Sequence, residues 1–130
     1  MSVNIRGERE LLAALERRIG KQAAQRISDK GLKRAADEFV KELKRQFATF
    51  KNKGYSIEEI TIMEPAYVAG VRVVKIRWRG PHDRYRIIHL NEWGTVKNPN
   101  PRGKGAIARA MRNSERAYRE AIKRALMEGL

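Results

Sequence analysis

The chain of 130 residues contains no cysteine, four prolines and few aromatic residues, which make up 7% of it. Without cysteine, a disulfide framework, a thiolate zinc site and thiol catalysis are all excluded. The scarcity of aromatic residues beside plentiful aliphatic ones favours a helical majority over a β-sandwich. The length is that of one domain, which buries roughly two-thirds of its unfolded surface in a modest core.

Long apolar runs are also missing from the sequence. No stretch approaches the roughly 20 apolar residues that a membrane-spanning helix needs. The first residues, MSVNIRGERELLAALERR, include no apolar run of signal-peptide length. We therefore expect no membrane partner, and the lack of cysteine is consistent with synthesis in a cytosol.

Acidic residues are outnumbered, with 15 Asp and Glu against 29 Lys and Arg, so the net charge is +14. The excess is +7 in residues 1–54, +1 in residues 55–93 and +6 in residues 94–130. Such a charge bears on partners and solubility, not on the fold. Nucleic acid, an anionic membrane or an acidic protein surface can use it, and it can also be a solvated surface without a partner.

The first 54 residues have the periodicity of helices. Leucines and Ile19 at helical spacing predict a helix over 8–19, and Gly20 is a candidate break. From Lys21 a new stripe continues at steps of mostly four residues, with Gly31 at one missing step. This pattern predicts either one long helix or two collinear pieces, because glycine costs about 1 kcal/mol relative to alanine inside a helix. The sequence KNKG at 51–54 is typical of a helix end.

The period changes in the middle of the chain. Ile57, Ile60 and Ile62 lead into a turn at 63–65. Residues 67–78 then alternate as one half-buried strand, which Gly80 and the following proline close. Residues 84–93 fit a strand or a helix. The helix is favoured because alternation is poor and Gly94 stands where a left-handed cap belongs.

The last helix is predicted from Ala106 to about Met127. One face carries an apolar stripe bordered by four alanines, and arginines and lysines fill the remainder. The chain is therefore expected to be a single α+β domain, residues 1–130. It comprises a helical region (1–54), a small antiparallel sheet plus a short helix (55–93), a basic loop (94–105) and a long C-terminal amphipathic helix (106–130).

Few groups of residues in the sequence could form a catalytic site or a metal site. His89 and Glu92 share a helix face at a spacing of three, but a metal site would need Asp83 or Glu64 as a third ligand, and no motif joins them. A histidine that caps the helix or lines the edge of the core, and a glutamate paired with a nearby arginine, explain them better. The adjacent Glu58 and Glu59 would point to opposite strand faces. No Walker or Rossmann loop occurs. We expect no enzyme activity, no catalytic residue, no metal site and no cofactor.

A basic loop and the helix after it favour phosphate contacts more than catalysis. The loop contains no acidic residue, and a following helix N-terminus favours anions. Aromatic side chains nearby can stack on bases, although Trp93 at its apolar spacing is expected in the core or a subunit interface. No motif for sequence-specific readout is present. The candidate residues for contacting DNA or a protein partner are Lys97, Arg102, Lys104, Arg109 and Arg112.

One segment also carries a recognisable motif: an aromatic, apolar residues with a histidine among them, an acidic residue, an aromatic, glycine and threonine. It consists of Tyr85, Ile88, His89, Leu90, Glu92, Trp93, Gly94 and Thr95. The motif resembles that of the tail-completion, or head–tail joining, proteins of long-tailed bacteriophages, often described as minor tail or minor capsid proteins. The resemblance covers about ten residues in motif and the whole chain in layout. One departure is that the loop ends in RGKG, where many members have an apolar Pro-Phe or Pro-His pair.

The resemblance implies a structural virion protein of the phage neck. Such a protein would form a homo-oligomeric ring that joins the head connector or stopper to the tail terminator or tube, with DNA passing through it. The basic loop would then face either the DNA or a neighbouring protein. The expected location is the virion neck or tail, and the bacterial host cytoplasm before assembly. The alternative is a free, non-specific nucleic-acid-binding protein of phage or bacterial origin.

Overall fold

The computed structural model describes residues 2–48, 54–84, 88–94, 97, 99–101 and 104–129. Helices and a small antiparallel sheet make up these residues, as the α+β prediction requires. The strands are β1 (Ser2–Arg6), β2 (Ile60–Ile62), β3 (Ala66–Val68) and β4 (Val71–Trp78). The helices are α1 (Arg9–Ile19), α2 (Lys21–Ala48), α3 (Tyr55–Glu58), α4 (Ile88–Trp93) and α5 (Ala106–Gly129).

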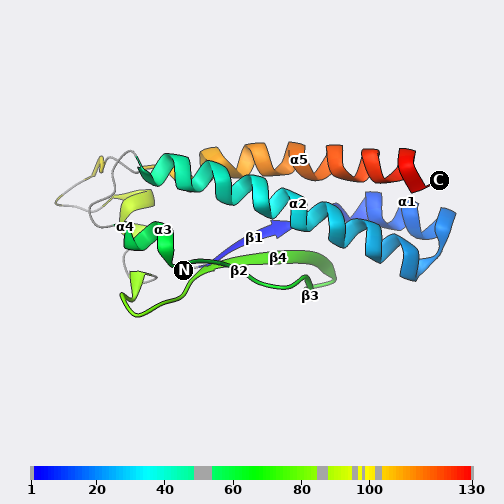
Figure 1. Cartoon of the computed structure of the whole chain (residues 1–130), viewed down its shortest axis with the longest axis horizontal. Coiled ribbons are helices and arrows are strands. Elements are labelled where there is room, and N and C mark those ends of the chain that lie inside the picture. Colours follow the sequence, from blue (N-terminus) through cyan, green and yellow to red (C-terminus); the bar gives the residue numbers. More distant parts are fainter. Residues whose placement is uncertain are drawn as a thin grey trace.

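The two long helices form one layer and the sheet forms the other (Figure 1). Helices α2 and α5 run antiparallel and make the most extensive contact in the molecule, while α1 packs beside α2. Strand β4 is central: it pairs with β1 on one side and with β2 and β3 on the other, always antiparallel. The core lies between these two layers, and α4 sits at the end where α2 finishes and α5 begins.

Strand β1 was not anticipated from the sequence, which assigned residues 1–54 to a helical region. Its alternation is nevertheless clear, because Val3 and Ile5 are buried while Ser2 and Arg6 are exposed. Five residues hold too few apolar positions to distinguish a strand from a helix start by periodicity alone. Pairing with β4, about 70 residues away, decides the conformation.

The strand predicted over 67–78 is wrong in one respect, because a hairpin turn interrupts it. Ala69 and Gly70 both have positive φ, 51° and 77°, and Val68 pairs with Val71 across them. Positive φ at both central residues of a two-residue loop is the type I′ geometry, which matches the twist of the flanking strands. The sequence lacks the usual Asn-Gly signal here, since alanine occupies the first position.

Helix α2 is a single continuous helix, which settles the choice between one rod and two pieces. Gly20 ends α1 with a φ of 86°, as expected of a break. Gly31 lies inside α2 against α5, where an added Cβ would lie 2.8 Å from Ile122 Cδ1. Glycine at this position therefore permits close helix packing. The expected helix stop at 51–53 lies outside the described residues, and Gly54 is left-handed.

The core is built from apolar side chains of all the larger elements. Trp78 on β4 stacks on Phe47 of α2, with ring centroids 6.1 Å apart. The indole Nε1 of Trp78 donates to the Ser56 carbonyl at 2.8 Å, so its one polar atom is satisfied. Burying side chains of this size contributes about 1.5–3 kcal/mol each.

Polar contacts fasten α2 both to the sheet and to α5. Arg72 on β4 donates from Nε and Nη2 to the two carboxylate oxygens of Asp29 on α2, at 2.8 and 2.9 Å. The hydrogen bonds to Asp29 raise the pKa of Arg72. Between α2 and α5, the Ser28 hydroxyl lies 3.0 Å from the Tyr118 hydroxyl. Burial raises the pKa of Tyr118.

The short-helix interpretation of residues 84–93 is confirmed for 88–93, which form α4. Ile88 anchors α4 in the core, and Gly94 follows it with a left-handed φ of 83°. Helix α5 begins at Ala106, as predicted, with a buried stripe that includes Ile107, Ser114 and Tyr118. In the described part of the chain, no helix is both long and apolar enough to span a bilayer.

Candidate functional site: the joint between α4 and α5

Glu92 fastens α4 to the first turn of α5. Its side chain is 3% exposed, and its carboxylate accepts the backbone N–H of Ile107 at 2.8 Å and that of Ala108 at 3.2 Å. These N–H groups are among the four that a helix N-terminus leaves without intrahelical acceptors. A carboxylate there also interacts favourably with the helix dipole. Glu92 therefore acts as a distant helix cap, and not as the partner of an arginine or as a metal ligand.

The backbone at the end of the basic loop completes this joint. Gly105 has a φ of 75° and donates its N–H to the Glu92 carbonyl at 3.0 Å. The Lys104 N–H donates to the Pro101 carbonyl at 3.0 Å, which closes a turn just before α5. Both the main chain and the side chain of Glu92 thus hold the start of α5.

The candidate cations divide into two groups. Lys104 donates from Nζ to the Pro99 carbonyl at 2.8 Å and to Asn100 Oδ1 at 3.2 Å. Arg109 bonds the Lys104 carbonyl at 2.9 Å and Gln46 Oε1 at 3.1 Å. These two side chains organise the loop end. Lys97 and Arg112 are exposed and make no ion pair or hydrogen bond with other described residues.

The residues of the motif have different positions in the structure. Trp93 is 69% exposed, so the prediction that it lies in the core of the chain is wrong. Its alternative position, in a subunit interface, stays a prediction. His89 lies on α4, but its side chain is not among the described parts of the molecule. Tyr85, Thr95 and Arg102 also lie outside the described residues.

Glu59 is a second buried carboxylate, and sequence reasoning missed its role. It is 3% exposed and accepts the backbone N–H of His82 at 2.7 Å and that of Arg84 at 3.0 Å. Gly80 packs against it so closely that a Cβ there would lie 2.6 Å from Glu59 Cγ. No local pattern signals such a contact, because the bonded residues lie more than 20 positions apart in the chain. Glu59 holds the segment that leads towards α4.

His82 is not placed as a catalytic base. Its ring stacks on that of Tyr55, with centroids 3.4 Å apart and an interplanar angle of 5°. Asp83, the possible third ligand of a metal site, has a left-handed φ of 49° in the same exposed turn. Among the residues that the structure describes, no group of three His, Asp or Glu side chains could hold a metal ion.

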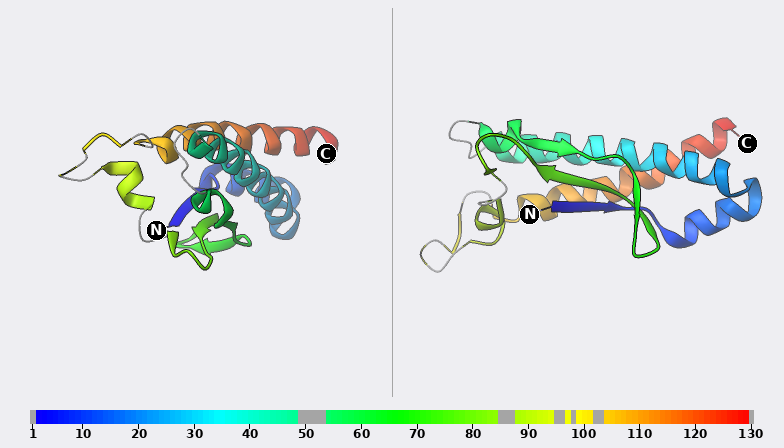
Figure 2. Two further views of the ribbon diagram at one scale, coloured as in Figure 1. Left: turned by 60° about the vertical axis from the view of Figure 1, so that its left-hand side comes forward. Right: turned by 90° about the horizontal axis from the view of Figure 1, so that it is seen from below.

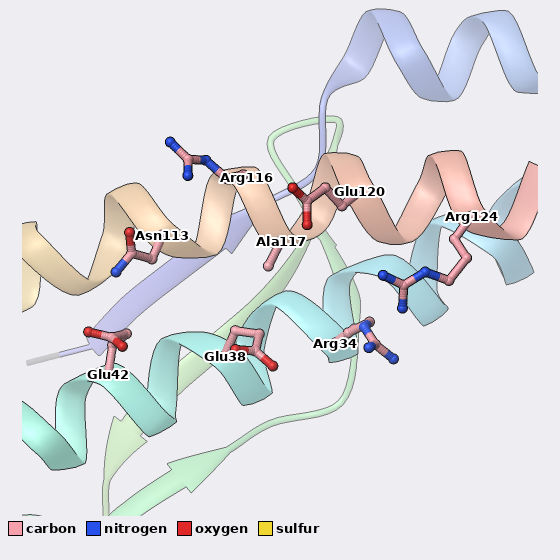
Figure 3. A pocket seen from close by; sticks show the side chains of 8 residues that line it. All are labelled: Arg34, Glu38, Glu42, Asn113, Arg116, Ala117, Glu120 and Arg124. Carbon is pink, nitrogen blue, oxygen red and sulfur yellow. The ribbon is translucent and has the colours of Figure 1, made fainter.

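A groove of about 380 Å³ lies on the face of α2 and α5 (Figure 3). Its charged lining has both signs, and two of its carboxylates are already paired. Glu38 lies 3.5 Å from Lys41, and Glu42 pairs with Arg45. The groove has neither a nucleophile next to a base nor two free carboxylates, so it suggests no reaction. Its lining residues are Arg34, Glu38, Glu42, Asn113, Arg116, Ala117, Glu120 and Arg124.

No family model matches this chain, and searches of curated proteins and of solved structures found no match either.

Proposed function

We propose that this chain is a structural protein of the neck of a long-tailed phage or prophage. It works in a homo-oligomeric ring that joins the head connector to the tail and encloses passing DNA. The proposal combines the motif resemblance over residues 85–95 with the α+β layout. The observation that carries it is the exposed Trp93 on a firmly held helix.

Trp93 is suited to be an interface anchor. Tryptophan is enriched among the residues that dominate binding energy in protein interfaces. Its exposure of 69% would be unfavourable for an isolated chain, and it lies next to Glu92, whose bonds to Ile107 and Ala108 fix the helix in place. An anchor that is already held rigid loses little conformational entropy on binding.

The nearby cations support contact with an anionic partner. Lys97 and Arg112 are exposed beside the joint. A ring that DNA crosses can line its channel with such side chains and contact phosphates without reading sequence. The same charges can instead dock against acidic patches of the connector or of the tail terminator.

Mass spectrometry of purified particles tests the proposal. In a phage or induced prophage that encodes the chain, we expect the protein in tailed particles. We expect Trp93→Ala, supplied in place of the natural chain, to yield heads without tails. The matched control is Met127→Ala, since Met127 is an exposed apolar residue, at 79%, at the opposite end of α5. Absence of the chain from the particles, or normal assembly with Trp93→Ala, would contradict the proposal.

A further inference from the structure

The face of the sheet that points away from the helices is basic. Residues paired across antiparallel strands point to the same side. Val74, Ile76 and Trp78 face the core, so their alternate neighbours on β4 face outward. These outward residues include Lys75 and Arg77. On β1, Asn4 pairs with Lys75 and Ser2 pairs with Arg77, which places Arg6 on the same side.

No helix lies over this face among the residues that the structure describes. Seen from below, the strands lie in front of α2 and α5 (Figure 2, right). Arg6 and Arg77 are exposed and Lys75 is partly exposed. None of the three makes an ion pair or hydrogen bond with another described side chain. The three cations are therefore available to a partner.

Carboxylates are missing from the outward positions of the four strands. Ser2, Asn4 and Thr61 supply small polar groups beside the cations, since Thr61 pairs with Arg77. Glu59 directly precedes β2, and its backbone carbonyl accepts the N–H of Arg79, which directly follows β4. Its side chain is buried and is committed to two backbone N–H groups. The face thus presents positive charge without internal neutralisation.

We propose that this outer sheet face, with Arg6, Lys75 and Arg77, binds the phosphate backbone of nucleic acid without reading its sequence. Lys75 and Arg77 are alternate residues of one strand and so lie about 7 Å apart on the face, which lets each contact a different phosphate. Small polar residues between the cations permit close approach of a backbone. The outward strand positions hold no aromatic residue of the kind that anchors protein interfaces, and the exposed Val68 lies at the hairpin end of the face.

Fluorescence anisotropy with a labelled random-sequence 30-bp duplex tests the inference on the full chain. Three variants each remove three positive charges. The first is Arg6→Gln/Lys75→Gln/Arg77→Gln in the sheet face. The second, a matched control, is Arg17→Gln/Arg18→Gln/Lys21→Gln, where all three residues are exposed at the far end of α1 and the start of α2. The third is Lys97→Gln/Arg112→Gln/Arg116→Gln, which runs from the basic loop at the joint along the first half of α5.

The sheet variant should bind the duplex at least about tenfold more weakly than either other variant at low salt. The slope of log affinity against log salt should become shallower by about 2.7, since each neutralised phosphate contributes about 0.9. Equal losses in all three variants would mean that net charge alone acts, and a loss confined to the third would assign binding to the joint. Either result overturns the inference.

Two further measurements keep the test decisive. If the triple sheet variant does not fold, the single change Arg77→Gln should still weaken binding more than Arg17→Gln does. Labelled polyglutamate serves as the acidic-protein probe. If the chain binds polyglutamate and not the duplex, an acidic protein surface is the partner and the inference fails. The inference does not rest on the proposed ring, because particle composition and DNA affinity are measured separately.

Discussion

Removing the buried carboxylate of Glu92 should destabilise the protein, because this one side chain holds α4 to the start of α5. The alanine variant leaves the N–H groups of Ile107 and Ala108 without their acceptor. Loss of a helix cap costs about 0.5–2 kcal/mol, and a buried donor left unpaired costs about 1–3 kcal/mol. Since the Ile107 bond is buried and that of Ala108 is partly buried, we expect Glu92→Ala to cost about 3 kcal/mol.

Glu92→Gln separates charge from shape. Glutamine keeps one oxygen acceptor but turns an NH₂ group towards the second backbone donor. It also loses the attraction between the carboxylate and the helix dipole, about 0.3–1 kcal/mol. We therefore expect Glu92→Gln to lower the free energy of unfolding by about 1–2 kcal/mol, which is less than the alanine variant does.

Urea unfolding followed by circular dichroism measures these differences. With a slope of about 2 kcal/mol per molar urea, Glu92→Ala should lower the midpoint by about 1.5 M. Glu115→Ala is the matched control, because Glu115 is exposed on α5, the helix that Glu92 caps, and should change stability by less than about 0.5 kcal/mol. If the two alanine variants share one midpoint, Glu92 does not cap α5 and the reasoning about the joint is refuted.

Three further changes probe the fold. Gly31→Ala should destabilise by about 1 kcal/mol, because overpacking against Ile122 outweighs the gain in helix propensity; in a double-mutant cycle Ile122→Val should relieve the clash, and additive effects would exclude it. Ala69→Asn should raise the melting temperature, since asparagine tolerates positive φ better than alanine; a lower value would contradict the turn type. Burial raises the pKa of Tyr118. The neutral Tyr118 hydroxyl therefore makes its full contribution to the free energy of unfolding below about pH 10, and this contribution is lost as the pH rises towards the folded-state pKa. The alkaline fall in unfolding free energy should therefore be shallower in Tyr118→Phe, and an unchanged slope would disprove the linkage.

Much of the helical layer could be predicted because helices are local structures. The stripes of 8–19, of the segment from Lys21 and of the segment from Ala106 required only a period of 3.6 residues, and α1, α2 and α5 follow them closely. Gly20 and Gly94 marked real ends, with φ values of 86° and 83°. Period, breakers and caps act over one or two turns, so they are visible in the chain itself.

The sheet was less predictable because its hydrogen bonds join distant segments. Strand β1 is defined by a partner about 70 residues away, and the hairpin turn has alanine, not asparagine, before its glycine, so it lacks the Asn-Gly pair that usually reveals such a turn. The alternation of apolar residues correctly predicted the two faces of β4. The same alternation continues through residues 67–70, so it gave no sign of the turn before β4.

The candidate site shows the same division. The acid-free loop and the cations at Lys97 and Arg112 follow from composition. The capping role of Glu92 and the burial of Glu59 do not, because their acceptor oxygens meet backbone donors far along the chain. Trp93 has an apolar spacing, yet only the packing of α4 decides that it faces outward.

The sequence by itself determined the helical majority, the strong positive charge and the absence of thiol chemistry, since these depend on residue identity and short-range period. The tertiary structure decided which charges share a surface. Arg6 and Lys75 are almost 70 residues apart, and only antiparallel pairing of β1 with β4 brings them to one face. It also decided which carboxylates are buried, because a buried charge persists only where folding supplies its hydrogen-bond partners.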